Sequence, residues 1–259
     1  MEFLKSSKRR SLVSELIYVG LNVALAVTLL IVVSATSSPL PAFALVLLSK
    51  WRILAVRPRY WFANIQTNLV DLIVSLSVVV LLYSATGAFT AQLLITILYI
   101  VWLLYIKPKS KRTFMAVQAG AAIFLGVSAL MIVSYDWIAT VPVIMMWLIG
   151  YSAARHVLSS YDEPHTSFYS LVWGLLFAEI GWLTYHWAFA YALPGVGDIQ
   201  LTQAALIALG ISFVAERAYV SYEKHGSVRS SDVIMPALLS VSVILLLIVF
   251  FNTITNGVI

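Results

Sequence analysis

LVSELIYVGLNVALAVTLLIVVS, residues 12–34, contains only one charged side chain, that of Glu15. A helix that crosses a lipid bilayer needs about 20 mainly apolar residues, so this run predicts a membrane-spanning helix. A secretory signal peptide is the alternative, because four lysines and arginines precede the run and Val33-Ser34-Ala35 resembles a cleavage site. The run exceeds the roughly 7–15 apolar residues of a signal peptide, which favours a retained first helix.

The same composition extends along the chain. Of its 259 residues, 61% are hydrophobic and 10% are charged, and its mean hydropathy is +0.96. Soluble domains are about 45–50% apolar and about 25% charged. No gap between apolar runs is long enough for a soluble domain, so we expect one all-α transmembrane helical bundle over residues 1–259. Its nine predicted spans are 12–34, 39–56, 63–83, 90–106, 114–134, 137–154, 168–191, 201–218 and 233–251.

The positive charges predict the orientation. If the N-terminus is cytoplasmic, all 16 lysines and arginines fall on the cytoplasmic side, as the positive-inside rule requires, and the C-terminus is external. We therefore expect a multi-pass protein in the cytoplasmic membrane of a prokaryote. Lys50, Arg52, Arg57 and Arg59 are expected to reach anionic lipid head groups. This distribution explains the net charge of +5 without a nucleic acid partner.

Several kinds of chemistry are excluded or unsupported by the residues present. The chain has no cysteine, which excludes disulfides, thiol nucleophiles and cysteine-ligated metal centres. It also has no Walker loop, His-Glu-x-x-His motif or dinucleotide-binding fingerprint. We expect no cofactor and no metal site, and we favour a protein that is not an enzyme.

Two acids fall inside predicted spans, where a charged side chain costs about 2.5–3.5 kcal/mol on insertion scales. Asp71 shares a helix face with Asn68, and Glu179 shares one with His186. Neither acid has a lysine or arginine deep in its own span. We expect each to be protonated, hydrogen-bonded, or in contact with a water-filled cavity.

These acids support two hypotheses from different classes. In the first, Asp71, Glu179, His186 and Asn68 form proton or cation sites for the transport of a small solute or ion. In the second, neutral carboxylic acids join helices in a noncatalytic subunit or scaffold of a membrane complex. A polar cavity that reaches Asp71 or Glu179 would favour transport.

Three short motifs offer a third, enzymatic hypothesis. Tyr135-Asp136, Gly195-Val196-Gly197-Asp198 and Pro236-Ala237-Leu238 occur in that order. This set resembles the YD, GxGD and PAL motifs of presenilin-type intramembrane aspartyl proteases, which also have nine spans. The resemblance implies that Asp136 and Asp198 are catalytic aspartates that share a proton. The charge pattern instead places Pro236 across the membrane from Asp198, which favours the noncatalytic hypotheses.

Small residues predict where helices pack closely. Ala116 and Gly120 in the fifth span are four residues apart, as are Ala204, Ala208 and Ser212 in the eighth. Such spacing lets helix backbones approach each other, so we interpret both stripes as internal packing seams. The polar segment 161–165 is interpreted as a solvent-exposed helix start, because proline and acidic residues favour that position.

Overall fold

A computed structural model describes residues 2–36, 38–187, 190–192 and 200–250. These residues form the predicted all-helical bundle, with one short antiparallel hairpin that pairs Ala190–Ala192 (β1) with Gln200–Thr202 (β2). Eight helices are long and apolar enough to cross a membrane, as in a multi-pass membrane protein. The α-helices are α1 (Glu2–Ala35), α2 (Leu40–Ser49), α3 (Trp61–Ser84), α4 (Phe89–Val101), α5 (Arg112–Val133), α6 (Thr140–Ser159), α7 (Thr166–Trp187), α8 (Gln203–His225) and α9 (Ser230–Phe250).

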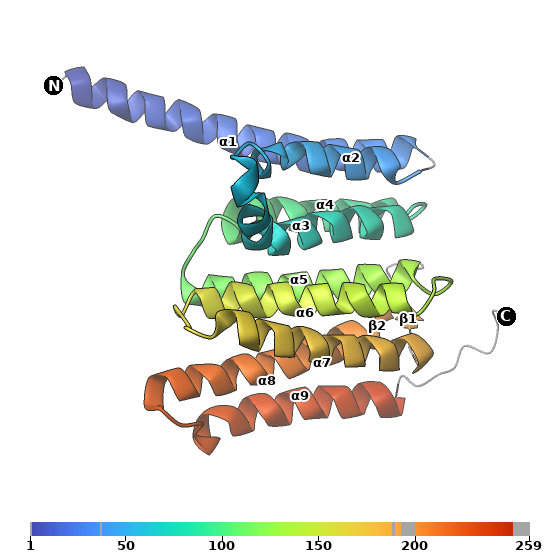
Figure 1. The fold of residues 1–259 in the computed structure, drawn as a ribbon. Helices are drawn as coiled ribbons and strands as arrows, with labels where there is room; N and C mark the ends of the chain where they lie inside the picture. The colour runs from blue at the N-terminus through green and yellow to red at the C-terminus, as the bar shows by residue number, and fades with distance from the viewer. Residues whose placement is uncertain (1, 37, 188–189, 193–199, 251–259) are drawn as a thin grey trace.

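Successive helices run in alternating directions, and they stack from α1 and α2 at one edge to α9 at the other (Figure 1). The connections that follow α2, α4, α6 and α8 therefore lie toward the same end of the bundle. We call it the basic end, because its connections carry Arg52, Arg57, Arg59, Lys107, Lys109, Lys111 and Arg229. The described turns after α1, α3 and α5 contain no lysine or arginine. This segregation matches the predicted alternation of spans.

The second predicted span, 39–56, is wrong as a continuous helix. At ten residues α2 is about 15 Å long, half the roughly 30 Å thickness of a bilayer core. Two 3₁₀ turns, η1 (Trp51–Ile53) and η2 (Pro58–Tyr60), continue the chain to α3. Pro58 disfavours helical backbone at Arg57, which is extended with φ −57° and ψ 139°.

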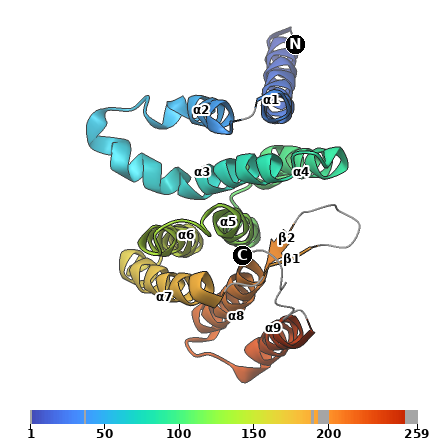
Figure 2. The same ribbon diagram turned by 90° about the vertical axis from the view of Figure 1, so that its right-hand side faces the viewer.

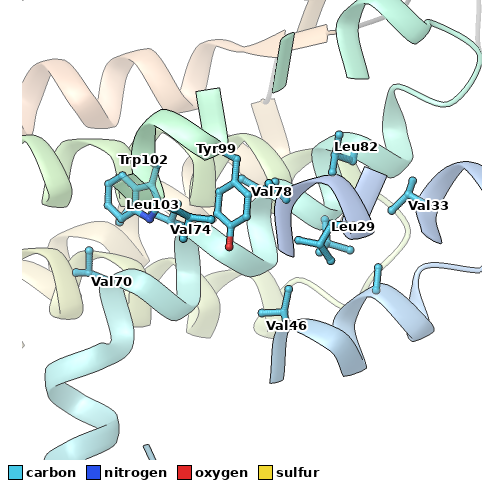
Figure 3. Close-up of a cluster of buried hydrophobic side chains, with 14 residues drawn as sticks. Leu29, Val33, Val46, Val70, Val74, Val78, Leu82, Tyr99, Trp102 and Leu103 are labelled. Carbon is cyan, nitrogen blue, oxygen red and sulfur yellow. The ribbon is translucent and has the colours of Figure 1, made fainter. Parts of the chain in front are cut away.

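The bundle has two clusters of buried apolar side chains. The first joins α1, α2, α3 and α4, and Figure 3 shows its members pointing toward one another: Leu29, Val33, Val46, Val74, Val78, Leu82, Tyr99 and Leu103. The second joins α5, α6, α7 and α8 through Ile123, Val127, Met146, Ile149, Phe177, Ala205 and Ala208. Ile73 of α3 packs against both clusters. Helix α3 is inclined to its neighbours and lies between the two halves (Figure 2).

Glycines bring α6 and α7 close together. A Cβ atom added at Gly150 would lie 2.4 Å from Phe177 Cγ, and one added at Gly181 would lie 2.8 Å from Met146 Cβ. A Cβ atom at Gly174 would lie 2.9 Å from Trp147 Nε1. Because no real Cβ atom sits at such distances, this seam depends on residues that have no side chain.

Candidate functional site

Asp71, predicted to have no basic partner, contacts two. Its Oδ2 atom accepts from the Lys50 ammonium and lies 2.9 Å from Lys107 Nζ. Lys50 and Asp71 are 9% and 13% exposed, whereas Lys107 is 35% exposed. Neither lysine lies in the same span as Asp71: they follow the ends of α2 and of the short helix after α4, so the contacts could not be predicted from that span. We call Lys50, Asp71 and Lys107 the lysine–aspartate triad.

The triad changes what Asp71 and Lys50 can do. A carboxylate that already accepts from two ammonium groups is a poor site for a transported cation. Lys50 also differs from its predicted role, because its buried ammonium points at Asp71 rather than toward lipid head groups. Arg52, Arg57 and Arg59 are exposed at the basic end, and their contact with anionic lipid stays a prediction.

The polar side chains near Asp71 on α3, Asn68 among them, form hydrogen bonds mostly within their own helix. Thr67 donates to the carbonyl of Ala63 at 2.9 Å, and Asn68 donates to that of Asn64 at 2.8 Å. Ser75 donates to the backbone carbonyl of Asp71 at 2.7 Å. Back-bonding to the carbonyl four residues earlier is a common way to satisfy such side chains within a helix. Asn68 is therefore engaged with its own helix.

A π-helix, η3 (Trp102–Ile106), leads from α4 to Lys107. Gln118 of α5 donates to Ile106 O, the last carbonyl of η3, at 2.7 Å and to Lys109 O, just beyond it, at 2.8 Å. His156 Nε2 lies 2.7 Å from Gln118 Oε1. Gln118 thus joins α6 to the end of α4 and supports the segment that carries Lys107.

Glu179 and His186 are not joined to each other by any interaction found in the described residues. Glu179 is exposed on α7 and makes no hydrogen bond or ion pair with the described part of the chain. His186 Nδ1 lies 2.8 Å from Trp182 O, and its ring lies 4.7 Å from the Trp182 ring. The carboxyl of Glu179 therefore faces the surroundings of the bundle.

The aspartates of the protease hypothesis are only partly described. Asp136 is exposed in the turn between α5 and α6, away from the basic end. Pro236 lies inside α9, six residues after its first residue at the basic end. Asp198 lies outside the described residues. Asp136 and Pro236 thus belong to different ends of the bundle.

A cavity of about 1200 Å³ lies among α5, α6, α7 and α8. This exceeds the roughly 300–1,000 Å³ of small-molecule pockets. Its lining on α5 runs from Arg112 to Phe124, a length of about 18 Å, or slightly more than one leaflet of a bilayer core. Val117 and Val172 line it and are about half exposed, so the cavity opens to the outside of the bundle.

The deep walls of the cavity are apolar and partly made of small residues. They include Ala116, Gly120, Phe124, Ala153, Val157, Trp173 and Leu209. The interpretation of both small-residue stripes as packing seams is thus correct only in part. Ala204 and Ala208 are buried in the second apolar cluster, whereas Ala116, Gly120 and Ser212 border empty space.

Charged and phenolic groups surround the cavity at the basic end. Arg112 Nη1 lies 3.2 Å from Glu223 Oε1, and its guanidinium carbon lies 4.4 Å from the centre of the Tyr161 ring. Tyr219 donates to Glu163 Oε2 at 2.5 Å. Glu216 and Arg217, on α8, complete the mouth and form an ion pair of 3.4 Å.

The charged and phenolic groups at the mouth of the cavity shift the pKa values of two residues in the turn before α7. Burial, reinforced by the Glu216 carboxylate, raises the pKa of Tyr161. The hydrogen bond from Tyr219 lowers the pKa of Glu163. Segment 161–165 was interpreted as a helix start, and α7 begins directly after it, at Thr166.

The residues at the mouth of the cavity were not predicted as a site from the sequence. A signal was present on α5, where Arg112, Ala116, Gly120 and Phe124 recur every four residues and share one face. A helix face with small residues that follow a basic residue can form either a close contact with another helix or the wall of a groove. Only the positions of α7 and α8 decide between these two arrangements.

The fold and the cavity define an all-helical, multi-pass type of membrane protein with a half-open internal cavity. Comparisons with protein-family models, with curated proteins and with solved structures find no match to the chain.

Proposed function

We propose that this protein binds a lipid-like amphiphile in the cavity among α5, α6, α7 and α8. The observation that carries the proposal is the lining of the cavity. Its long apolar interior suits an acyl or similar chain. Its mouth carries positive charges, from Arg112 and Arg217, and negative charges, from Glu163 and Glu216. The half-exposed side chains Val117 and Val172 give a membrane lipid a lateral way in.

The direction of the bound molecule follows from the distribution of polar groups. Its head group would lie at the basic end beside Arg112, Tyr161 and Arg217, and its tail would extend along α5 toward Phe124. The protein would then take its ligand from the leaflet at the basic end. On the predicted orientation, that leaflet faces the cytoplasm.

The experiment uses native mass spectrometry of the full chain released from mild detergent. We expect the parent protein to retain one lipid-sized adduct. Ala116→Trp places a large ring in the cavity and should remove the adduct, whereas Ala24→Trp, on an exposed position of α1, should leave it in place. Absence of an adduct on the parent, or equal retention by both variants, would contradict the proposal.

Transport of a small solute or ion through Asp71 and Glu179 stays a prediction. The lining of the large cavity includes neither acid, and Asp71 is already paired with two lysines. The role as a subunit of a membrane complex, the aspartyl protease alternative and the location in a prokaryotic cytoplasmic membrane also stay predictions.

A further inference from the structure

Glu179 occupies an unusual position for an acidic residue. It lies 13 residues after the start of α7, about 20 Å along a helix of about 33 Å, and therefore near the middle of a span. It is exposed on the outer surface of the helix and has no partner in the described part of the chain. An exposed carboxyl at this depth would face lipid, which is costly.

The surface around Glu179 is suited to another helix. Leu175 and Leu183 lie one turn before and one turn after it on the same face, and they are 59% and 49% exposed. Trp182, 49% exposed, lies beside them. This apolar face surrounds a single hydrogen-bonding group, which is the pattern by which membrane helices associate specifically.

We propose that the Glu179 face binds a transmembrane helix of a different protein, and that this helix carries a lysine or arginine at the depth of Glu179. Charge complementarity selects this occupant. A basic side chain would satisfy the carboxyl, whereas an apolar helix would leave it unpaired.

A second copy of the chain does not meet this requirement. Copies related by an axis along the membrane normal present equivalent residues at equal depth, so Glu179 would face Glu179 or its apolar neighbours. The lysines and arginines of the described residues lie toward the basic end, and Lys50 and Lys107 are bound to Asp71. His186 is two turns away along α7. The complementary charge must therefore come from another protein.

The test is photo-crosslinking in native membranes with p-benzoylphenylalanine in place of Leu175. The matched control has the same probe in place of Leu239, which is nine residues into α9, as Leu175 is into α7, and is similarly exposed, at 61%. We expect Leu175 alone to crosslink to a membrane protein. The crosslinked peptide should be a membrane span that contains a lysine or arginine.

The role of the Glu179 charge is tested with Glu179 variants of the protein that carries the probe at Leu175. Glu179→Leu should reduce the crosslinked product about three- to thirtyfold, the range expected for one interhelical hydrogen bond. Glu179→Lys should abolish the product, and a change of the partner's basic residue to glutamate should restore it. Because Glu179 has no partner within the described chain, these variants should keep the thermal unfolding temperature of the parent in detergent.

Several outcomes would overturn the inference. They are crosslinking to a second copy of the chain, crosslinking to lipid alone, equal products from Leu175 and Leu239, or a product that Glu179→Leu does not change. The proposal is independent of the cavity, since loss of the lipid adduct and loss of the crosslink are measured on different variants.

Discussion

Lys107 Nζ lies 2.9 Å from Asp71 Oδ2, the same carboxylate oxygen that the Lys50 ammonium contacts. The Asp71 carboxylate therefore connects α3 to the ends of α2 and η3. Two buried polar atoms of these elements, Asp71 Oδ1 and Trp102 Nε1, have no hydrogen-bond partner among the described residues. The ion pairs are therefore the main polar compensation available to the buried carboxylate.

Replacement of Asp71 should destabilise the protein strongly. Asp71→Asn leaves the buried Lys50 ammonium beside Lys107 without a counter-charge, and removal of one partner from a buried pair typically costs about 3–5 kcal/mol. The measurement is thermal unfolding in detergent. Glu223→Gln is the control, because it breaks the exposed pair with Arg112 and should cost at most about 1 kcal/mol. Equal losses for the two variants would contradict a structural role for the triad.

The seam between α6 and α7 should not tolerate a methyl group at Gly150. The added Cβ would lie 2.6 Å from Phe177 Cβ, and the Phe177 side chain is fully buried. We expect Gly150→Ala to cost about 1–3 kcal/mol, as overpacking does. Gly20→Ala is the matched control, since nothing lies within 4 Å of its Cβ position. If the two variants unfolded at the same temperature, the close approach of α6 and α7 would be in doubt.

The hydrogen bond from Tyr219 to Glu163 predicts a pH-dependent contribution to stability. Because the pKa of Glu163 is lower in the folded protein than its ordinary value of 4.5, the contribution is full above that value. It is lost as the pH falls through the lowered, folded-state pKa. Tyr219→Phe should therefore lower the unfolding temperature at neutral pH, and the difference from the parent should shrink in acid. A difference that stays constant from neutral to acidic pH would argue against this bond.

The predicted orientation can be tested with single cysteines, because the chain has none of its own. A cysteine at Asp136, in the exposed turn between α5 and α6, should react with an impermeant thiol reagent on intact cells. A cysteine at Lys109, at the basic end, should react only after the membrane is permeabilised. Reaction at Lys109 alone in intact cells would reverse the orientation.

The helical fold was predictable because each apolar run is a local property of the sequence. Predicted span 63–83 corresponds to α3, 61–84, and predicted span 114–134 corresponds to α5, 112–133. The error at 39–56 arose because an apolar run shows neither where Lys50 turns inward nor how Pro58 alters the backbone before it. The direction of Lys50 depends on Asp71 of α3, a helix that comes later in the chain, whereas the effect of Pro58 on Arg57 is local.

The candidate site was harder to predict because its parts are far apart in the sequence. Asp71 was predicted as a candidate because it is the one acid in an apolar run. Its partners Lys50 and Lys107 lie 21 and 36 residues away in the sequence, at positions typical of cations at the membrane interface. The cavity is a space left between helices, so no residue type marks it. Arg112 and Tyr219 line the cavity only because α5 and α8 pack around that space, which the sequence alone does not show.

The division into two apolar clusters has a consequence for biosynthesis. Apart from Ala122 of α5 and its partly buried neighbours on that helix, the first cluster consists of residues up to the end of η3, so most of it has been synthesised by that point. Domains generally fold in order from the N-terminus as the chain emerges. Lys107 follows η3 directly, and it is the last member of the triad to be made. All three members of the triad therefore precede α5 in the chain, so the ion pairs that join α2, α3 and the end of η3 need no residue of the C-terminal half.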